Sequence, residues 1–404
     1  MFKPNLRFLH SADLHLDSPF KGLSHLPEPI YKDVLNSTIV AFKRLIDLAI
    51  KENVDFVLIV GDLFDQESSS IKSSLELKKG LEKLNSNGIN AYISYGNHDY
   101  MMQEKAKLIF PQNTYIFPSD GVNSTTYHKH GQPLAEISGF SYRKQAIKEN
   151  MVASYQRVTD ASYHIATLHG SLKTDQIHDH YAPFLIEDLK KIETDYWALG
   201  HIHQREIISH EPLAIYPGNI QGRHMKERGE KGCYIVELNG SKPTYQFYPL
   251  QNIVFSEEEV AVEDIQKPSE LVEFLLKFKD SLRKRHSKMM VRLILNIREN
   301  DFSEDRVEDL LDTLNESEED EENWIWFSEL KLRQEQISWD EIIESNPFIK
   351  EVLKTIEETD DLSSFLLDLK RHPLYRKNVD LNLDELQSEI KTEAEKLILS
   401  KINK

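Results

Sequence analysis

The chain has 404 residues, of which 40% are hydrophobic and 9% aromatic, and it carries a formal net charge of −18. This length exceeds one compact core and predicts two or three domains, and because no run approaches the ~20 apolar residues that cross a bilayer, a membrane-spanning chain is excluded. A single cysteine, Cys233, excludes an internal disulfide framework and predicts a cytoplasmic location, and the opening residues predict a strand instead of a secretion signal.

The first part of the chain predicts alternating strands and helices. Short runs rich in β-branched and aromatic residues, typical of buried strands, occupy 6–9, 54–60 and 89–95. Apolar residues recur at helical spacing between them, over 34–52 and 69–85. This order predicts β-α-β connections.

From residue 134 the pattern changes to strands joined by loops. These strands are expected at 135–139, 163–168, 196–199, 213–216, 232–238 and 244–249. Residues 1–250 are therefore predicted to form one α/β domain, a sandwich of two facing sheets with flanking helices.

The second part of the chain differs in charge and in histidine content. Residues 1–250 contain 27 Lys and Arg against 29 Asp and Glu, whereas residues 251–404 contain 22 against 38. Of the 16 histidines, 14 precede residue 250. The means to bind a metal are thus concentrated in the first part, and the acidity in the second.

Residues 251–338 are predicted to form a small α/β cap domain. The expected strands are 253–262, 288–297 and 324–332, and the expected helices are 268–285 and 304–314. The acidic run 316–322 is interpreted as a solvated loop, with a specific partner site as the alternative.

Residues 339–404 are predicted to be helical, with breaks at Pro347 and Pro373. In the last helix, 383–402, apolar residues form one stripe. Such a stripe packs on its own domain or docks on another chain, and the sequence favours neither.

Five short motifs carry the chemistry of the first part, each directly after an apolar run. They are Asp13-Leu14-His15, Gly61-Asp62-Leu63-Phe64-Asp65, Gly96-Asn97-His98-Asp99, Leu168-His169-Gly170 and Gly200-His201-Ile202-His203. If their strands share a sheet, the motifs lie along one edge, where open α/β sheets bind ligands. An Asp-x-His is expected roughly once by chance, but Gly-Asn-His-Asp only about 0.005 times, so the complete set is not accidental.

The polar residues of these motifs suit two divalent cations, with Asp62 as the bridging carboxylate. The expected ligands are Asp13, His15 and His203 for one ion and Asn97, His169 and His201 for the other. Mixed imidazole, carboxylate and carbonyl donors favour Mn²⁺, Fe²⁺ or Zn²⁺ over Mg²⁺. Two such ions ~3.5–4 Å apart produce hydroxide near neutral pH and neutralise phosphate charge. The sequence therefore predicts a two-metal phosphoesterase centre.

His98 is expected to face the substrate without binding an ion. We assign it as the general acid toward the leaving oxygen, or as the group that stabilises the transition-state charge. Asp99 is expected to hold a ring nitrogen of His98 and so to fix its tautomer and orientation. The predicted catalytic residues are these two.

At these residues the chain resembles the calcineurin-like metallophosphoesterase superfamily, from residue 6 to about 250. Residues 8–16 and 61–65 resemble the SbcD-type DNA-repair nucleases, and Asp17-Ser18-Pro19-Phe20 resembles their YhaO-like bacterial branch. The family's ligands fall on the seven residues assigned above, and its catalytic histidine falls on His98.

The resemblance implies a Mn²⁺-dependent DNA nuclease that acts in DNA repair. The expected activity is that of an exonuclease, with endonuclease activity as a further expectation. It further implies a homodimer formed through helices of the core and a cap that helps to orient DNA. The C-terminal helices, 339–404, are expected to bind a coiled-coil ATPase of the SbcC class.

Two positions depart from the family's pattern. Archaeal and eukaryotic relatives have histidine where this chain has Asp65, and the usual glycine after the Asp-x-His-Leu segment is Asp17. Asp65, Arg223 and His224 are candidates for substrate contacts, with a plain surface loop as the alternative for the last two.

Two other functions stay open. A small-molecule phosphodiesterase or a phosphoprotein phosphatase would use the same motifs, although such an enzyme has little use for the residues after 250. A weakly active scaffold that only binds DNA ends or the ATPase is the second alternative, and the complete ligand set argues against it.

Overall fold

The chain forms two compact units. The first comprises residues 1–260, 264–295 and 303–331, and the second comprises 261–263, 296–302 and 332–404. The computed structural model describes residues 3–65, 70–101, 110–174, 181–262, 267–286, 288–297, 307–334, 347–358, 391, 393, 394, 397 and 398. The division into domains 1–250, 251–338 and 339–404 stays a prediction.

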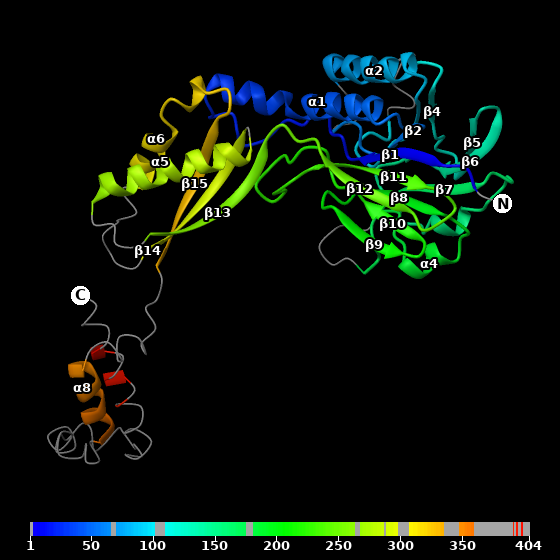
Figure 1. Ribbon diagram of the computed structural model, residues 1–404. Coiled ribbons are helices and arrows are strands. Elements are labelled where there is room, and N and C mark those ends of the chain that lie inside the picture. The colour runs from blue at the N-terminus through cyan, green and yellow to red at the C-terminus, as the bar shows by residue number, and fades with distance from the viewer. Residues whose placement is uncertain are drawn as a thin grey trace. The chain divides into compact units, whose positions relative to one another are not determined.

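The first sheet has six strands in the order β12-β11-β1-β2-β3-β4 (Figure 1). They are β1 (Leu6–Ala12), β2 (Phe56–Val60), β3 (Asn90–Ser94), β4 (Thr114–Ile116), β11 (Gly232–Leu238) and β12 (Thr244–Pro249). β1, β2 and β3 run parallel, with Phe8 opposite Phe56 and Phe56 opposite Asn90. The carboxyl ends of these three strands therefore meet at one edge of the sheet.

Two helices cover the outer face of this sheet. α1 (Glu28–Lys51) starts after Pro27, and α2 (Ile71–Ser86) starts after Ser70, whose side chain accepts a hydrogen bond from the N–H of Ser73. Apolar side chains at helical spacing, such as Phe42 and Leu45, pack against Val57 of β2.

The second sheet also has six strands, in the order β5-β6-β7-β8-β10-β9. They are β5 (Asn123–Lys129), β6 (Gln132–Gly139), β7 (Tyr163–His169), β8 (Tyr196–Gly200), β9 (Glu206–His210) and β10 (Leu213–Tyr216). β6, β7, β8 and β10 run parallel to one another. The short helices η1 (Val152–Ser154) and α4 (Ile186–Lys190) contribute Val152 and Leu189 to the cluster on its outer face, around Trp197.

The two sheets share a core between their inner faces. The ring of Phe8 in β1 lies 5.2 Å from that of Phe56 in β2 and 5.3 Å from that of Tyr196 in β8. The next residue along β1, Leu9, belongs instead to the cluster beneath α1 and α2. This alternation follows from the two-residue period of a strand and makes β1 a central, fully covered strand.

A three-stranded module follows the sandwich. It consists of β13 (Val254–Val262), β14 (Met289–Ile297) and β15 (Ile325–Gln334), with α5 (Pro268–Arg285) and α6 (Val307–Asn315) along one face of the sheet (Figure 1). Its Phe255 and Trp324 pack with Ile30 of α1. Asp33 of α1 accepts hydrogen bonds from Lys288 Nζ at 2.6 Å and Trp324 Nε1 at 2.9 Å.

The second unit contains α8 (Pro347–Glu358), in which Ile349 is buried. The helix begins at the proline where the sequence predicts a break. The apolar stripe predicted over 383–402 lies for the most part outside the described residues. No helix in the described part of the chain is both long and apolar enough to cross a bilayer.

The predicted fold class is confirmed, since the structure has two facing mixed sheets with flanking helices. Strands β4, β5 and β9 were not predicted. The acidic run 316–322 is not wholly solvated, because it forms the short helix η3 (Glu318–Asp320) and buries Glu318. This carboxylate lies 2.8 Å from Lys279 Nζ and 2.7 Å from Arg283 Nη2, so it is an internal counter-charge.

Candidate metal centre

The five motifs meet at one end of the sandwich, at the carboxyl ends of strands from both sheets. β1, β2 and β3 lead into the first three motifs, and β7 and β8 lead into the last two. The condition of one shared sheet is not met, because the strands divide between the two predicted sheets, but the motifs still gather at one place. Each sheet supplies part of the ligand set, and the centre lies between them.

Several of the expected ligands have left-handed backbone conformation. Asp13 has φ +52°, His15 has φ +43°, Asp62 has φ +49° and His201 has φ +95°. Non-glycine residues avoid this region, and each such residue costs about 1–3 kcal/mol. The sharp turns at the strand ends thus aim side chains at the centre at the expense of backbone strain.

Close packing at the centre requires glycine at two positions. A Cβ atom on Gly61, which has φ +78°, would lie 2.0 Å from His169 Nδ1. A Cβ atom on Gly96 would lie 2.1 Å from Asp62 Oδ1. These glycines let the backbone of one motif contact the ligand of another.

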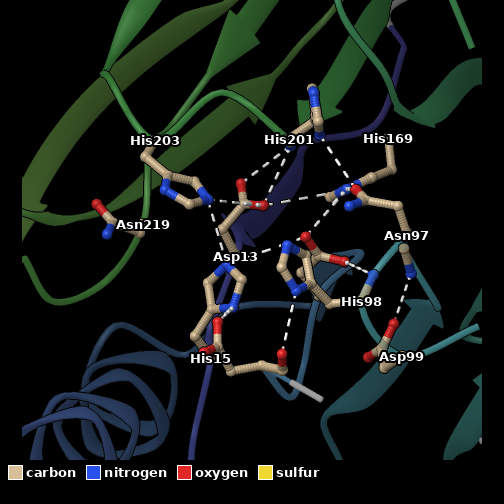
Figure 2. Close-up of polar contacts among 12 residues, drawn as sticks. Asp13, His15, Asn97, His98, Asp99, His169, His201, His203 and Asn219 are labelled. Carbon is tan, nitrogen blue, oxygen red and sulfur yellow. Dashed lines mark hydrogen bonds and ion pairs between the residues drawn. The ribbon is translucent and has the colours of Figure 1, made fainter. Parts of the chain in front are cut away.

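One half of the centre consists of Asp13, His15 and His203, whose side chains turn toward one another (Figure 2). His15 Nε2 lies 3.2 Å from His203 Nε2, and His203 Nε2 lies 3.9 Å from Asp13 Oδ1. Two imidazole nitrogens that face each other beside a carboxylate are suitable donors for one divalent cation.

The other half consists of Asn97, His169 and His201. Asn97 Oδ1 lies 3.0 Å from His169 Nε2 and 3.2 Å from His201 Nδ1. Asp62 Oδ2 is 3.4 Å from His169 Nε2 and 3.9 Å from His15 Nε2. The structure thus brings all seven expected ligands together and places Asp62 between the two halves.

The electrostatics of the centre fit a pair of cations. Asp13 and Asp62 are buried, and among the described residues no lysine or arginine lies within ion-pair distance of either carboxylate. Burial raises the pKa of Asp13; burial acts in the same sense on Asp62, but His169 holds the pKa of Asp62 well below its usual value. Buried charges need opposite charges, which two divalent ions would supply.

His98 lies beside the ligands without joining either half. Its backbone N–H donates to Asp62 Oδ1 at 3.0 Å, and its Nδ1 lies 3.1 Å from the carbonyl oxygen of Asp65. A carbonyl accepts only from a protonated Nδ1, so this contact fixes the ring's tautomer and orientation.

The role predicted for Asp99 is wrong. Its carboxylate accepts the backbone N–H groups of Leu63 and Gly96, each at 2.7 Å, and no hydrogen bond joins it to His98 in the described part of the chain. Burial and the charge of Asp62 raise the pKa of Asp99 to about 8. Asp99 therefore holds two motif loops together and does not orient the ring.

The candidate substrate residues form contacts around His15 and His203. Asp65 Oδ1 lies 2.9 Å from His15 Nδ1 and 2.5 Å from Arg223 Nη1. The His224 side chain is 55% exposed and lies 3.6 Å from Glu227. The structure thus turns Asp65 and Arg223 toward the ligands and leaves only His224 largely in solvent.

Glu227 was not predicted. Its carboxylate is buried and accepts a hydrogen bond from His203 Nδ1 at 2.7 Å. It follows no apolar run and belongs to no motif, so the sequence carries no local signal for it. The one general indication is that a metal-binding histidine usually donates its second ring N–H to a carboxylate or carbonyl oxygen.

Comparisons with known proteins identify the family to which the sequence is similar. Residues 6–205 match the family described as calcineurin-like phosphoesterase. The chain is 40% identical to the uncharacterized metallophosphoesterase YhaO of Bacillus subtilis over 396 residues, 97% of this chain and 96% of that protein. It is 28% identical to the DNA double-strand break repair protein Mre11 of Sulfurisphaera tokodaii over 253 residues, 59% of this chain and 62% of that protein. A solved dimetal phosphatase from Danio rerio aligns with a TM-score of 0.38 and 9% identity over 62% of this chain and 100% of that chain.

Proposed function

Because the chain belongs to the calcineurin-like metallophosphoesterase family, we propose that it is a DNA nuclease that hydrolyses phosphodiester bonds with two divalent cations, Mn²⁺ in the cell. The observation that carries this proposal is the pair of buried carboxylates, Asp13 and Asp62, which face imidazoles and have no lysine or arginine of the described residues within ion-pair distance. Such a site is complete only when cations bind.

The chemistry divides between the ions and the chain's own residues. When bound, two divalent ions lower the pKa of the attacking water and neutralise charge on the phosphate. Asp62 holds the two halves in register, and the contact with the Asp65 carbonyl orients His98 toward the space between them. His98 then gives a proton to the leaving oxygen or stabilises the charge that develops there.

DNA is proposed as the substrate on the strength of the relatives. Several proteins that match the chain at 24–28% identity are named DNA double-strand break repair protein Mre11, for example those of Sulfurisphaera tokodaii and Archaeoglobus fulgidus. The three-stranded module adds support, because a small-molecule phosphodiesterase or a phosphoprotein phosphatase has little use for it. We therefore favour a role in DNA repair.

The proposed partners are DNA, a second copy of the chain and a coiled-coil ATPase of the SbcC class, in the cytoplasm. We propose that the region 339–404 binds the ATPase. Removal of the residues after Asp340 is expected to leave phosphodiesterase activity intact and to abolish co-purification with the ATPase. A truncated protein that still bound the ATPase would overturn the docking proposal.

The substrate is tested by incubating the protein and Mn²⁺ with labelled single-stranded, blunt and hairpin DNA, with and without the ATPase, and reading product lengths. A generic phosphodiester is assayed in parallel, and Asp62→Asn is the inactive control. Cleavage of the generic ester alone would favour a small-molecule phosphodiesterase or a phosphatase. Absence of both activities would favour a scaffold.

A further inference from the structure

The two facing imidazoles of the centre each have a carboxylate at their second nitrogen. His15 Nδ1 lies 2.9 Å from Asp65 Oδ1, and His203 Nδ1 lies 2.7 Å from Glu227 Oε1. A carboxylate that accepts Nδ1–H leaves the lone pair of Nε2 free for a metal ion and fixes the orientation of the ring.

Arg223 joins these two carboxylates. Its Nη1 lies 2.5 Å from Asp65 Oδ1, and its Nη2 lies 3.4 Å from Glu227 Oε1. The Arg223 side chain is only 13% exposed, so its charge is poorly screened by solvent. One guanidinium therefore holds in place the acceptors of both ligands.

Arg223 also contacts a third group of potential metal ligands. His15, Asp65 and His98 offer ligand atoms within 4.8 Å of one another, as a third cation site would. The Asp65 oxygen that faces His15 is the same one that contacts Arg223 Nη1. The guanidinium thus places its positive charge beside this group.

Each carboxylate is fixed from behind as well. Asp17 accepts the backbone N–H of Asp65 at 3.1 Å and that of Ser70 at 3.0 Å. Glu227 Oε2 accepts Asn219 Nδ2 at 2.9 Å and the backbone N–H of Arg223 at 2.8 Å. These bonds leave the carboxylates little freedom to turn away from the imidazoles.

The other half of the centre lacks such support at His169. Its Nδ1 lies 3.1 Å from the carbonyl oxygen of Val60, a neutral acceptor. Its distance to the nearest oxygen of Asp13, 3.9 Å, is too long for a hydrogen bond, and a bond to a neutral carbonyl holds a ring less firmly than a bond to a charged carboxylate. The two ion sites are therefore supported differently.

We propose that Arg223, by holding Asp65 and Glu227 against His15 and His203, makes the site of Asp13, His15 and His203 the tighter of the two metal sites. This inference rests on the two-cation centre of the proposed function. Arg223 acts here as a positioning residue, because it contacts the two carboxylates and the Nδ1 atom of His203, at 3.2 Å, and not the Nε2 atoms that face the centre.

The test is a Mn²⁺ titration of the full chain by calorimetry, with electron paramagnetic resonance to separate isolated ions from coupled pairs. Arg223→Met is expected to weaken one of the two sites about 10–100-fold and to leave the other unchanged. Arg223→Lys should restore part of that affinity. The matched control is Arg228→Met, because Arg228 lies on the same loop but pairs with Glu257.

The melting temperature in a chelator is measured alongside. The positioning role would be overturned if Arg223→Met lowered this melting temperature and also weakened Mn²⁺ binding at both sites. It would also be overturned if Arg223→Met left both Mn²⁺ affinities intact. If Arg223→Met does not fold, Glu227→Gln is titrated instead, because it removes the carboxylate charge and keeps the size of the side chain. It is likewise expected to weaken Mn²⁺ binding at one of the two sites. A wild-type chain that binds fewer than two ions would overturn the proposed function; one that binds two ions without cleaving DNA would overturn only the substrate.

Discussion

In the three-stranded module, the ammonium of Lys279 and the carboxylate of Glu318 are both buried and lie 2.8 Å apart. In the metal centre, Asp13 and Asp62 are buried just as deeply, but their partners are imidazoles. The module neutralises its buried charges with a lysine and an arginine of its own, whereas the carboxylates of the centre face only imidazoles, which can bind added cations. Removal of metal should therefore affect these regions differently.

The largest expected effect falls on the centre. His98→Ala should lower kcat for a phosphodiester by about 10²–10⁴-fold, because proton transfer or charge stabilisation by one positioned side chain contributes that much. Mn²⁺ stoichiometry should stay unchanged, because His98 is not a ligand. His128→Ala, at an exposed histidine, is the control, and wild-type activity in His98→Ala would refute the assigned role.

A substitution in the three-stranded module should instead lower the stability of the fold, by an amount that does not depend on metal. Glu318→Gln removes the charge that faces Lys279 and Arg283, and is expected to lower the free energy of unfolding by about 3 kcal/mol. Urea denaturation in chelator and in Mn²⁺ should give the same loss. A loss that disappeared when Mn²⁺ was added would contradict the separation of the two regions.

Metal should stabilise the centre directly. At a Mn²⁺ concentration about 100-fold above the dissociation constant, each occupied site should raise the free energy of unfolding by about 2.7 kcal/mol. Asp62→Asn should abolish most of this gain, because Asp62 contacts both halves. The measurement is urea denaturation with and without Mn²⁺, and an equal gain in the variant would refute the bridging position.

The smallest expected effect concerns a histidine outside both regions. His10 is buried against Tyr196 and Leu199, and burial lowers its pKa from 6.5 to about 3. Below pH 6.5 the unfolded chain therefore binds a proton at His10 that the folded chain does not bind. The folded state thus loses free energy of unfolding as the pH falls from about 6.5 toward 3.

His10→Gln should flatten the dependence of unfolding free energy on pH by about 1.4 kcal/mol per pH unit below 6.5, measured in chelator. His210→Gln, at an exposed position, should leave the slope unchanged. An unaltered slope in His10→Gln would show that another group sets the acid sensitivity.

The sequence predicts buried strands well and edge strands poorly. Strands such as β2 and β8 consist of consecutive apolar residues, because both of their faces are covered, and their predicted bounds agree within two residues. β5 reads Asn-Ser-Thr-Thr-Tyr-His-Lys and lies at a sheet edge, where half-exposed polar residues leave no apolar pattern. Its pairing with β6 depends on the folded chain and not on the local sequence pattern.

In the metal centre, the sequence predicts ligand identity but not the partners of the ligands. Each ligand sits in a motif directly after a strand, so its position follows from local pattern. Asp65 and Arg223 are separated by 158 residues, and Glu227 lies in a loop without a motif, so only the folded chain brings them to His15 and His203. Asp99 shows the converse: it neighbours His98 in sequence, but its side chain points to two backbone amides.

The left-handed conformation of Asp13, His15, Asp62 and His201 also limits the engineering of this enzyme for heat resistance. Glycine adopts this conformation without strain, but here each exchange to glycine would delete a proposed metal ligand. Relieving the backbone strain at these positions would therefore also remove the side chains on which activity is proposed to depend. Thermostable descendants of this chain should carry their compensating substitutions elsewhere, in the helices and the three-stranded module.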